Sequence, residues 1–449
     1  MEPRDHPADP RPSSDVSARV GLAGLAGLCA WIVICREWAS IAELFGIPGP
    51  RAPLSGRYAA LAAVLASALP MVLWSLLVDK VHRRASTGID WKSPRPLSAA
   101  LETTIPKLAG LWATWLLIAA IYLIARWYWA GPYLFAMEVL GAAAPLMVLG
   151  SVLYVPWLDR VLIEPHDGAW HFGTMLIGRE VWDRGQIKHH LRGWAVKGFF
   201  CAFMISILPG GFAAVVEADF GAITHDPARL AGSLIELLFV IDVQIAMVGY
   251  IVTMKPLDAH IRTANPHLDA WVAALMCYPP FILMGGGAVI DYHQGTQDWS
   301  VWMADHPALL WSWGAALVFL TAIYAWATVA FGLRFSNLTY RGVLTNGPYA
   351  FTRHPAYLSK NAFWWLSTLP FLTTTGSTVE AVRNTALLML VSLIYYWRAR
   401  TEERHLLAED VKYRDYHAWM ARNGVVTRVI SQILALPGRG RRIIVQPAE

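Results

Sequence analysis

Residues 346–361 read Asn-Gly-Pro-Tyr-Ala-Phe-Thr-Arg-His-Pro-Ala-Tyr-Leu-Ser-Lys-Asn, and a second polar stretch, Arg-Thr-Glu-Glu-Arg-His-Leu, occupies residues 400–406. The residues between them are mostly apolar, apart from the short polar turn Thr-Thr-Thr-Gly-Ser at 373–377. One membrane helix over 357–373 and a second over 380–399 would form a hairpin with this turn at the far face of the bilayer. Both polar stretches would then emerge side by side at the same face.

The composition indicates an integral membrane protein. Of the 449 residues, 56% are hydrophobic and only 15% are charged, whereas an average soluble protein is about 25% charged. Several apolar runs reach the roughly 18 residues that a membrane-spanning helix needs. The net charge of +5 is therefore better explained by where the basic residues lie than by nucleic acid, and we expect no nucleic-acid partner.

The apolar runs predict an all-α, polytopic membrane bundle of about ten transmembrane helices. They lie at residues 18–35, 58–79, 108–125, 133–157, 198–216, 230–254, 270–290, 307–331, 357–373 and 380–399. Within the seventh run, three consecutive glycines at 285–287 allow close packing or a local break. Residues 1–17 are rich in Pro, Asp, Arg and Ser, which predicts a disordered tail, and the first apolar run is expected to be a retained anchor.

The basic residues predict the orientation. With the N-terminus in the cytoplasm, the cytoplasmic loops contain dense Lys and Arg clusters, for example at residues 80–107 and 179–197. The loop 291–306 on the opposite side has three Asp and no Lys or Arg. Because Lys and Arg collect on the cytoplasmic side of membrane proteins, both termini and both polar stretches are expected to face the cytoplasm.

No metal site is expected. The four cysteines all fall in apolar runs and lack metal-ligand spacing. The histidines of the loop 159–197 are scattered among Trp residues, a pattern typical of a segment that lies on the lipid headgroups. Three acidic residues, Glu138, Glu236 and Asp242, lie inside predicted spans. Each is either paired with a polar group on a neighbouring helix or part of a substrate pathway.

The two polar stretches carry opposite charges. Pro355 restricts the preceding His354 to an extended conformation, so Arg353 and His354 would present cationic donors suited to a carboxylate or phosphate. Glu402 and Glu403 would suit an ammonium, a sulfonium or a ribose hydroxyl pair. A zwitterionic cofactor with a cationic centre would satisfy both. Spacing alone slightly favours a simpler interpretation, a latch in which the opposite charges pair and close the hairpin.

The order of the motifs changes that balance. Gly-Pro-Tyr-x-x-x-Arg-His-Pro-x-Tyr at 347–357, Glu-Glu-x-x-Leu at 402–406 and Tyr-x-x-Tyr at 413–416 together resemble the isoprenylcysteine carboxyl methyltransferase and phospholipid methyltransferase superfamily. The lead-in Phe-Gly-Leu-Arg-Phe-Ser at 331–336 is similar as well, and the resemblance covers roughly residues 310–420. In that superfamily the two motifs build a cytosolic pocket for S-adenosylmethionine, and the methyl acceptor approaches from the bilayer.

The resemblance implies a set of site residues. By position, the cofactor-binding residues would be Tyr349, Arg353, His354, Pro355, Tyr357, Leu358, Glu402 and Glu403. Arg353 and Glu403 would be catalytic, because Arg353 would orient the cofactor carboxylate or an anionic acceptor, and Glu403 or His405 would serve as base for an amine acceptor.

The chain departs from the family pattern at two places. Ser359-Lys360-Asn361 stands where many members have small residues, and the residues around 410–411 replace the usual Phe-Gly. Lys360 and Asn361 would lie about one turn inside the ninth helix and are the candidates to contact the acceptor's polar head. Snorkelling of the Lys360 ammonium to the surface is the commoner alternative.

The family core needs only half of the predicted spans. This predicts an N-terminal five-helix membrane module over 18–225 and a C-terminal catalytic module with a cytoplasmic tail over 226–449. The expected function is that of an integral-membrane S-adenosylmethionine-dependent methyltransferase acting on a lipid or on a lipidated or amphiphilic acceptor. The Ala-, Arg- and Trp-rich composition suggests the bacterial inner membrane.

Two other functions remain open. Membrane sterol reductases, which use NADPH, share the C-terminal architecture and have a similar number of spans. Their Arg-His-x-Asn-Tyr motif is not matched, because Ala356 stands at the Asn position. The third alternative is a non-catalytic scaffold or transport protein of the same fold, which the altered Ser359-Lys360 pair allows.

Overall fold

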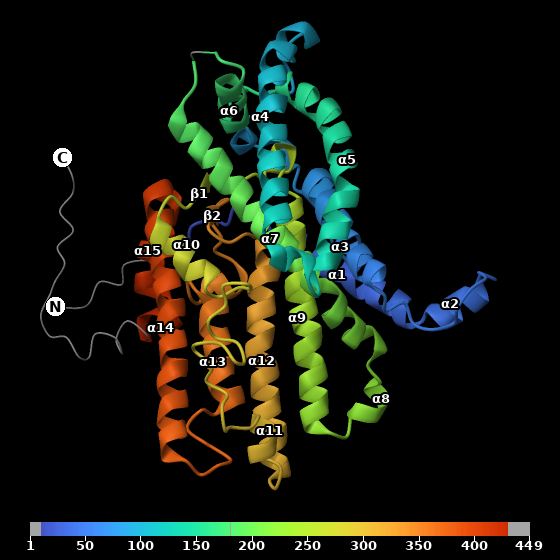
Figure 1. The fold of residues 1–449 in the computed structure, drawn as a ribbon, viewed down its shortest axis with the longest axis vertical. Coiled ribbons are helices and arrows are strands. Elements are labelled where there is room, and N and C mark those ends of the chain that lie inside the picture. Colours follow the sequence, from blue (N-terminus) through green and yellow to red (C-terminus); the bar gives the residue numbers. More distant parts are fainter. Residues whose placement is uncertain (1–9, 180, 430–449) are drawn as a thin grey trace, which may run out of the picture.

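The computed structural model describes residues 10–179 and 181–429. Almost all of its regular structure is helical (Figure 1). Within this described part, eight helices are long and apolar enough to cross a membrane. They are α1 (Ala18–Arg36), α3 with its π-helical extension (Arg57–Val78), α4 (Leu97–Ile124), α5 (Tyr133–Asp159), α7 (Arg184–Glu217), α9 (Pro227–Ile251), α12 with a 3-10 turn (Pro307–Arg334) and α14 (Thr378–Glu409). The all-α, polytopic membrane bundle predicted from the sequence is confirmed.

Shorter elements connect the long helices. They include α2 (Trp38–Leu44), α6 (Gly168–Leu176), α8 (Phe220–Ile223), α10 (Leu268–Leu275), α11 (Trp299–Trp302), the 3-10 turn η7 (Gly347–Ala350) and α13 (Pro355–Thr368), and α15 (Val411–Asn423) follows α14. One two-stranded antiparallel sheet pairs β1 (Thr263–Ala264) with β2 (Thr339–Tyr340), with Thr263 opposite Tyr340. This sheet joins the segment after α9 to the segment that leads into the first motif.

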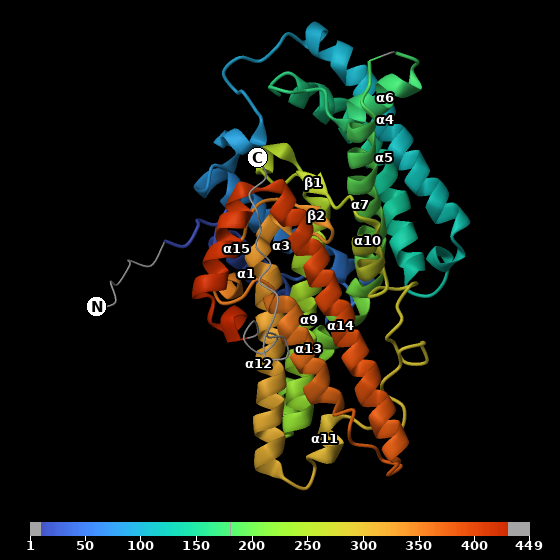
Figure 2. The same cartoon turned by 90° about the vertical axis from the view of Figure 1, so that its left-hand side faces the viewer.

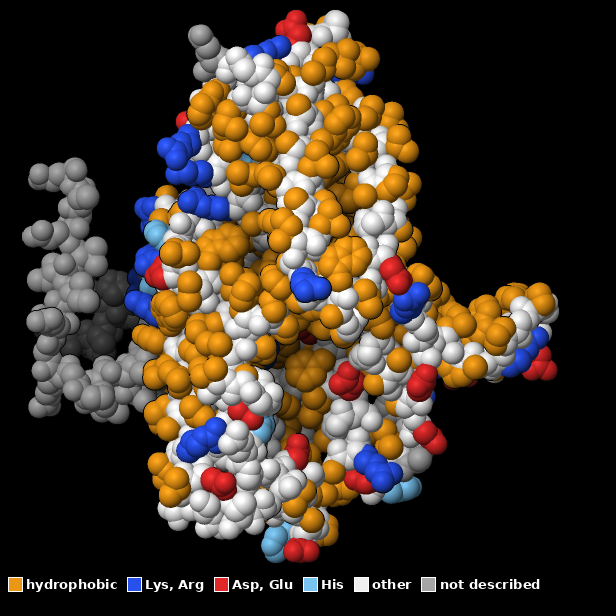
Figure 3. Space-filling view, viewed as in Figure 1, with side chains coloured by type: hydrophobic (Ala, Val, Ile, Leu, Met, Phe, Trp, Pro, Cys, Tyr) orange, Lys and Arg blue, Asp and Glu red, His pale blue; other side chains and the backbone are white. Residues whose placement is uncertain are grey.

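The helices form two groups. In both ribbon views, α9, α12, α13 and α14 run side by side in one half of the molecule, whereas α4, α5 and α6 occupy the other half (Figures 1 and 2). The long helix α7 packs against α9 as well as against α5 and α6, and so links the two groups. Exposed leucine and isoleucine side chains such as Leu116, Ile124 and Leu153 lie on α4 and α5, where apolar side chains cover the surface (Figure 3). Such a surface is suited to lipid.

Glycines allow the closest helix contacts. A Cβ atom added to Gly110 of α4 would lie 2.0 Å from the carbonyl oxygen of Ala169 in α6, and one added to Gly173 would lie 1.7 Å from that of Pro106. The two backbones therefore touch directly, which is how small residues drive helix association in membranes.

The seventh predicted span, 270–290, is not one helix. α10 ends at Leu275, and an irregular segment follows because Pro279-Pro280 removes helical hydrogen bonds and three glycines follow. This segment packs through Met284 and Ile290 against Leu388 and Val391 of α14. Irregular backbone at membrane depth is tolerated when protein buries it in this way.

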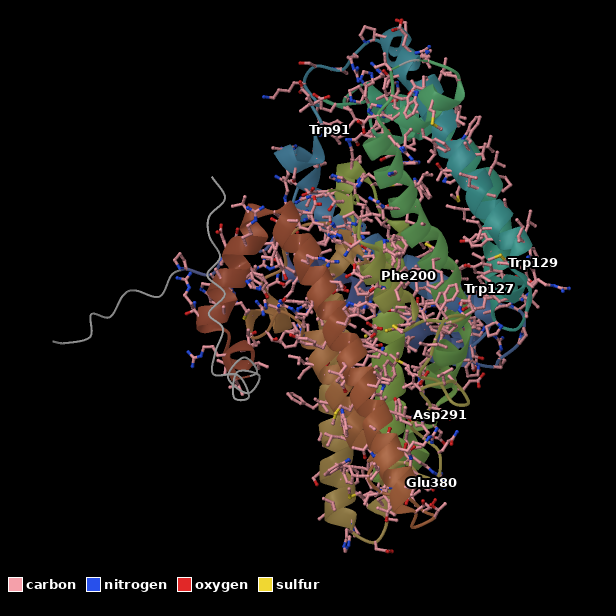
Figure 4. The ribbon with its side chains drawn as sticks, turned by 60° about the vertical axis from the view of Figure 1, so that its left-hand side comes forward. Trp91, Trp127, Trp129, Phe200, Asp291 and Glu380 are labelled. Carbon is pink, nitrogen blue, oxygen red and sulfur yellow. The ribbon has the colours of Figure 1, made fainter. Side chains whose placement is uncertain are left out.

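The far end of the irregular segment is also fixed. The amide of Asn384 in α14 donates a hydrogen bond to the Gln294 carbonyl at 2.7 Å, and the backbone N–H of Thr374 donates to the carbonyl of Gly295 at 2.8 Å. Figure 4 places Asp291 and Glu380 near this end of α14.

The ninth predicted span, 357–373, is a shorter helix than expected. α13 begins with Pro355, whose fixed φ suits the first helical position, and ends at Thr368 because Leu369 adopts a left-handed conformation and Pro370 follows. Its 14 residues rise about 21 Å, less than the roughly 30 Å hydrocarbon core. The tenth helix is longer than predicted, because α14 continues to Glu409. Of the ten predicted spans, eight are thus long helices in the described residues, and the seventh and ninth are an irregular segment and a short helix.

Candidate functional site

The first motif is held against α12 by a tight turn. Gly347 has φ +57°, a conformation that glycine adopts without strain, and a Cβ there would lie 3.2 Å from the indole nitrogen of Trp326. The turn η7 ends at Ala350, and α13 begins five residues later at Pro355. Arg353 and His354 therefore lie in the short link between η7 and α13, directly beside the part of α14 that carries the second motif.

The carboxylate of Glu403 joins the two motifs. It lies 2.9 Å from Nε of Arg353, and Oε1 is 3.0 Å from Nε2 of His354. Its other oxygen accepts a 2.9 Å hydrogen bond from Arg400, and Nε2 of His417 in α15 is 4.0 Å away. The Glu403 side chain is only 3% exposed, so the motifs meet in a buried ion-pair network, as the predicted hairpin required.

Glu402 belongs to a second network. It accepts a hydrogen bond from the hydroxyl of Tyr357 and lies 3.5 Å from Nε of Arg398. The Arg398 guanidinium donates to Asn337 at 2.5 Å, and it lies over the ring of Tyr357 at 5.1 Å and over that of Tyr278 at 5.3 Å. At 25% exposure, Glu402 is the more accessible of the two carboxylates.

One cavity opens between these networks. It has an empty volume of about 1170 Å³, including the part open to solvent. Its lining includes Tyr278, Tyr324, Thr328, Phe331, Asn337, Tyr349, Arg353, His354, Tyr357, Lys360, Tyr395, Arg398, Glu402, His405, Tyr413 and Tyr416. The lining therefore combines cationic donors, one carboxylate and many aromatic faces, which is the donor set that an amphiphilic zwitterion would require.

The helix α15 closes one side of this cavity. The hydroxyl of Tyr416 donates a 2.7 Å hydrogen bond to the carbonyl of Tyr349, and burial raises the pKa of the Tyr416 phenol, which stays a neutral donor. Tyr413 is also buried. Burial, with Arg353 nearby, lowers the pKa of His417 below its usual value, although Glu403 opposes this shift.

The N-terminal strap, residues 12–16, binds to the chain just before the first motif. The backbone N–H of Asp15 donates to the Val343 carbonyl at 2.9 Å, and the Val343 N–H donates to the Asp15 carboxylate at 2.7 Å. Lys412 of α15 lies 2.5 Å from the same carboxylate, and Asn346 donates to the Val16 carbonyl at 2.9 Å. Of the predicted disordered tail 1–17, residues 1–9 lie outside the described residues; the strap itself is hydrogen-bonded.

Comparison with protein families agrees with this geometry. Residues 313–408 match the isoprenylcysteine carboxyl methyltransferase (ICMT) family. The ICMT match starts in α12 and ends in α14, so it contains both motifs, and the resemblance inferred from them is confirmed. No curated protein and no solved structure matches the chain. The ICMT match supports a membrane methyltransferase in general.

The structure separates the site residues predicted from the sequence into two groups. Tyr349, Arg353, His354, Tyr357, Glu402 and Lys360 line the cavity. Pro355, Leu358, Asn361 and Glu403 are not part of its described lining. Pro355 starts α13, the Asn361 amide donates to the Tyr357 carbonyl, and Glu403 lies behind Arg353 and His354.

Sequence reasoning missed Arg398. It is 3% exposed and stands one helical turn before Glu402, an i,i+4 pair that a helix places on one face. This spacing could have identified it. Its partners Tyr278 and Asn337 lie far from it in the chain, the first in the irregular segment after α10 and the second beside β2, and no local pattern could have brought them together.

Proposed function

We propose that this protein is an integral-membrane methyltransferase that uses S-adenosylmethionine and acts on a lipid or amphiphilic acceptor at the cytoplasmic face, in a bacterial inner membrane. One observation carries the proposal. In the segment that matches the ICMT family, a single cavity places Arg353 and His354 near the carboxylate of Glu402, with tyrosine rings between them.

The lining fits the cofactor by charge. Arg353 and His354 are suited to a carboxylate, and Glu402 is suited to an ammonium or a ribose hydroxyl pair. The faces of Tyr349 and Tyr357 suit a sulfonium or an adenine ring. Nε of Arg353 lies 2.9 Å from Glu403, behind the cavity, and this contact holds the Arg353 side chain in the cavity lining.

S-adenosylmethionine supplies an activated methyl group when it is bound. Arg353 and Glu402 would orient it from opposite sides, and Tyr413 and Tyr416 would exclude water. Most of the acceleration would then come from positioning and electrostatics. Because the Glu403 carboxylate is already paired with Arg353, His354 and Arg400, we assign it a positioning role instead of the role of a base.

An acceptor that is already anionic needs no base. An amine acceptor would have to lose a proton, and His405 is better placed than Glu403 to take it. Nε2 of His405 lies 3.0 Å from the hydroxyl of Thr263, and His405 lines the cavity.

Calorimetric titration of the detergent-purified protein tests the proposal. S-adenosylmethionine and its demethylated product should bind, NADPH should not, and Glu402→Gln should abolish or strongly weaken binding. Glu380→Gln is the matched control, since Glu380 lies at the other end of the same helix and is not part of the described cavity lining. Binding of NADPH alone would indicate a reductase, and binding of none of the three would indicate the scaffold alternative.

A further inference from the structure

Lys360 is a partly buried cation that lines the cavity. It lies about one turn into α13, and its ammonium lies 5.1 Å from the ring centroid of Tyr324 and 5.4 Å from that of Trp364. Within the described residues, the structure gives the ammonium no hydrogen bond and no ion pair. The ammonium is thus held between two aromatic faces beside the cavity.

The nearest acidic group is already satisfied. Asp242 of α9 is 6% exposed and accepts a hydrogen bond from the hydroxyl of Thr328 in α12. The hydroxyl of Tyr324 interacts with the same carboxylate. Asp242 thus fixes the α12 side chains that surround Lys360 and lowers the cost of a charged ammonium there, but it does not form a direct ion pair with it.

An ammonium has three donors and no acceptor. Aromatic faces compensate part of its charge, at about 0.5–2 kcal/mol, but they do not replace hydrogen-bond acceptors. Ionisable groups inside a membrane protein are costly and usually mark a substrate or ion pathway. A hydrogen-bond acceptor for the Lys360 ammonium can reach it from the cavity, which Lys360 lines.

We propose that Lys360 binds the anionic group, a carboxylate or a phosphate, of the amphiphile that receives the methyl group. The inference rests on the proposed function, and it narrows the acceptor to anionic amphiphiles. Arg353 and His354 lie in the link before α13, whereas Tyr324, which contacts Lys360, comes from the C-terminal part of α12. Arg398, the other cation of the lining, is already paired with Glu402, so Arg353 is left for an anionic group of the cofactor and Lys360 for one of the acceptor.

Binding of defined lipids to the full-length protein in phosphatidylcholine nanodiscs tests this inference. The probes are radiolabelled oleate and dioleoyl phosphatidic acid, and oleyl alcohol and dioleoylglycerol are their neutral counterparts. The anionic probes should bind, and Lys360→Met should weaken them by about 10- to 100-fold, as expected for a charge-assisted hydrogen bond of about 1.5–3 kcal/mol. Lys360→Arg should largely retain binding. Oleate alone would identify a carboxylate, and phosphatidic acid alone a phosphate.

Two controls separate the outcomes. Lys188→Met removes an exposed cation of α7 that is not part of the described cavity lining and should leave lipid binding unchanged. Lys360→Met should bind S-adenosylmethionine like the unmodified protein, which shows that the variant is folded. Equal binding of neutral and anionic probes, or unchanged binding in Lys360→Met, would overturn the inference. If the unmodified protein does not bind S-adenosylmethionine, the proposed function is refuted instead.

Discussion

Replacing Glu403 by Gln should weaken cofactor binding although Glu403 lies behind the cavity. The substitution keeps the shape and one acceptor oxygen but removes the charge that holds Arg353 and His354. A hydrogen bond to a charged group contributes about 1.5–3 kcal/mol. If Gln keeps one of the two contacts, the loss of about one such bond corresponds to a roughly 10- to 100-fold higher Kd for S-adenosylmethionine. Calorimetry on the purified variant measures this change.

A double-mutant cycle distinguishes positioning from general damage. If Glu403 acts by holding Arg353, then Arg353→Ala and Glu403→Gln together should cost less than the sum of the two single changes, with a coupling energy of about 0.5–3 kcal/mol. Glu380→Gln, at the other end of the same helix, should leave the Kd unchanged. A Kd for Glu403→Gln within threefold of the unmodified protein, or strictly additive effects, would refute the positioning role.

Three further predictions concern stability, and thermal denaturation in detergent measures each. Asp15→Asn removes the ion pair to Lys412 that holds the strap on α15 and should cost about 0.5–1 kcal/mol; an equal melting temperature would contradict this. Gly110→Ala should lower the melting temperature because its Cβ would meet backbone at 2.0 Å, and overpacking of this kind lowers the free energy of unfolding by about 1–3 kcal/mol. Gly141→Ala, in open space, should leave the melting temperature unchanged. His417 has a pKa below its usual 6.5 because of burial and Arg353, so the unfolded chain binds more protons and stability should fall as the pH drops below 6.5. This acid-induced loss should be smaller in His417→Gln, and an identical pH profile would exclude His417 as its source.

Hydropathy predicted the membrane class and the eight long helices correctly, but two of the ten spans that it predicted, 270–290 and 357–373, are not helices of membrane-spanning length. A run of apolar residues reports transfer to lipid, and it does not report whether the backbone can be helical. The segment after α10 is apolar, yet Pro279-Pro280 and the three glycines prevent a continuous helix. The Pro after Leu369 similarly shortens α13. The helix-breaking Pro and Gly residues at both places can be seen in the sequence. Whether an irregular segment is tolerated there depends on its burial against α14, which only the fold provides.

The site was predictable where its residues are close in sequence. The hairpin brought Arg353 and His354 to Glu403 because α13 and α14 fix both ends of the link. The sequence did not reveal which carboxylate faces the cavity, because adjacent residues on a helix point about 100° apart. Glu402 therefore lines the cavity while Glu403 is buried behind it.

Elements outside the family-matched segment complete this site. Tyr278 precedes residue 313 by a long stretch of chain, α15 follows residue 408, and the strap comes from the start of the chain. α1 also packs on α12 at backbone distance, since a Cβ on Gly21 would lie 1.9 Å from the Val329 carbonyl oxygen.

The predicted division into two modules between residues 225 and 226 stays a prediction. The packing shows how closely the two predicted modules are joined. One continuous buried cluster includes Leu28 of α1, Phe200 of α7 and Ile245 of α9, so the proposed catalytic half shares its core with the other half. Because Asp242 of α9 accepts a hydrogen bond from Thr328, which lines the cavity, a helix that precedes the family-matched segment contributes to the shape of the proposed acceptor site. We therefore expect the family-matched segment to determine the reaction that is catalysed and the rest of the chain to determine which acceptor binds.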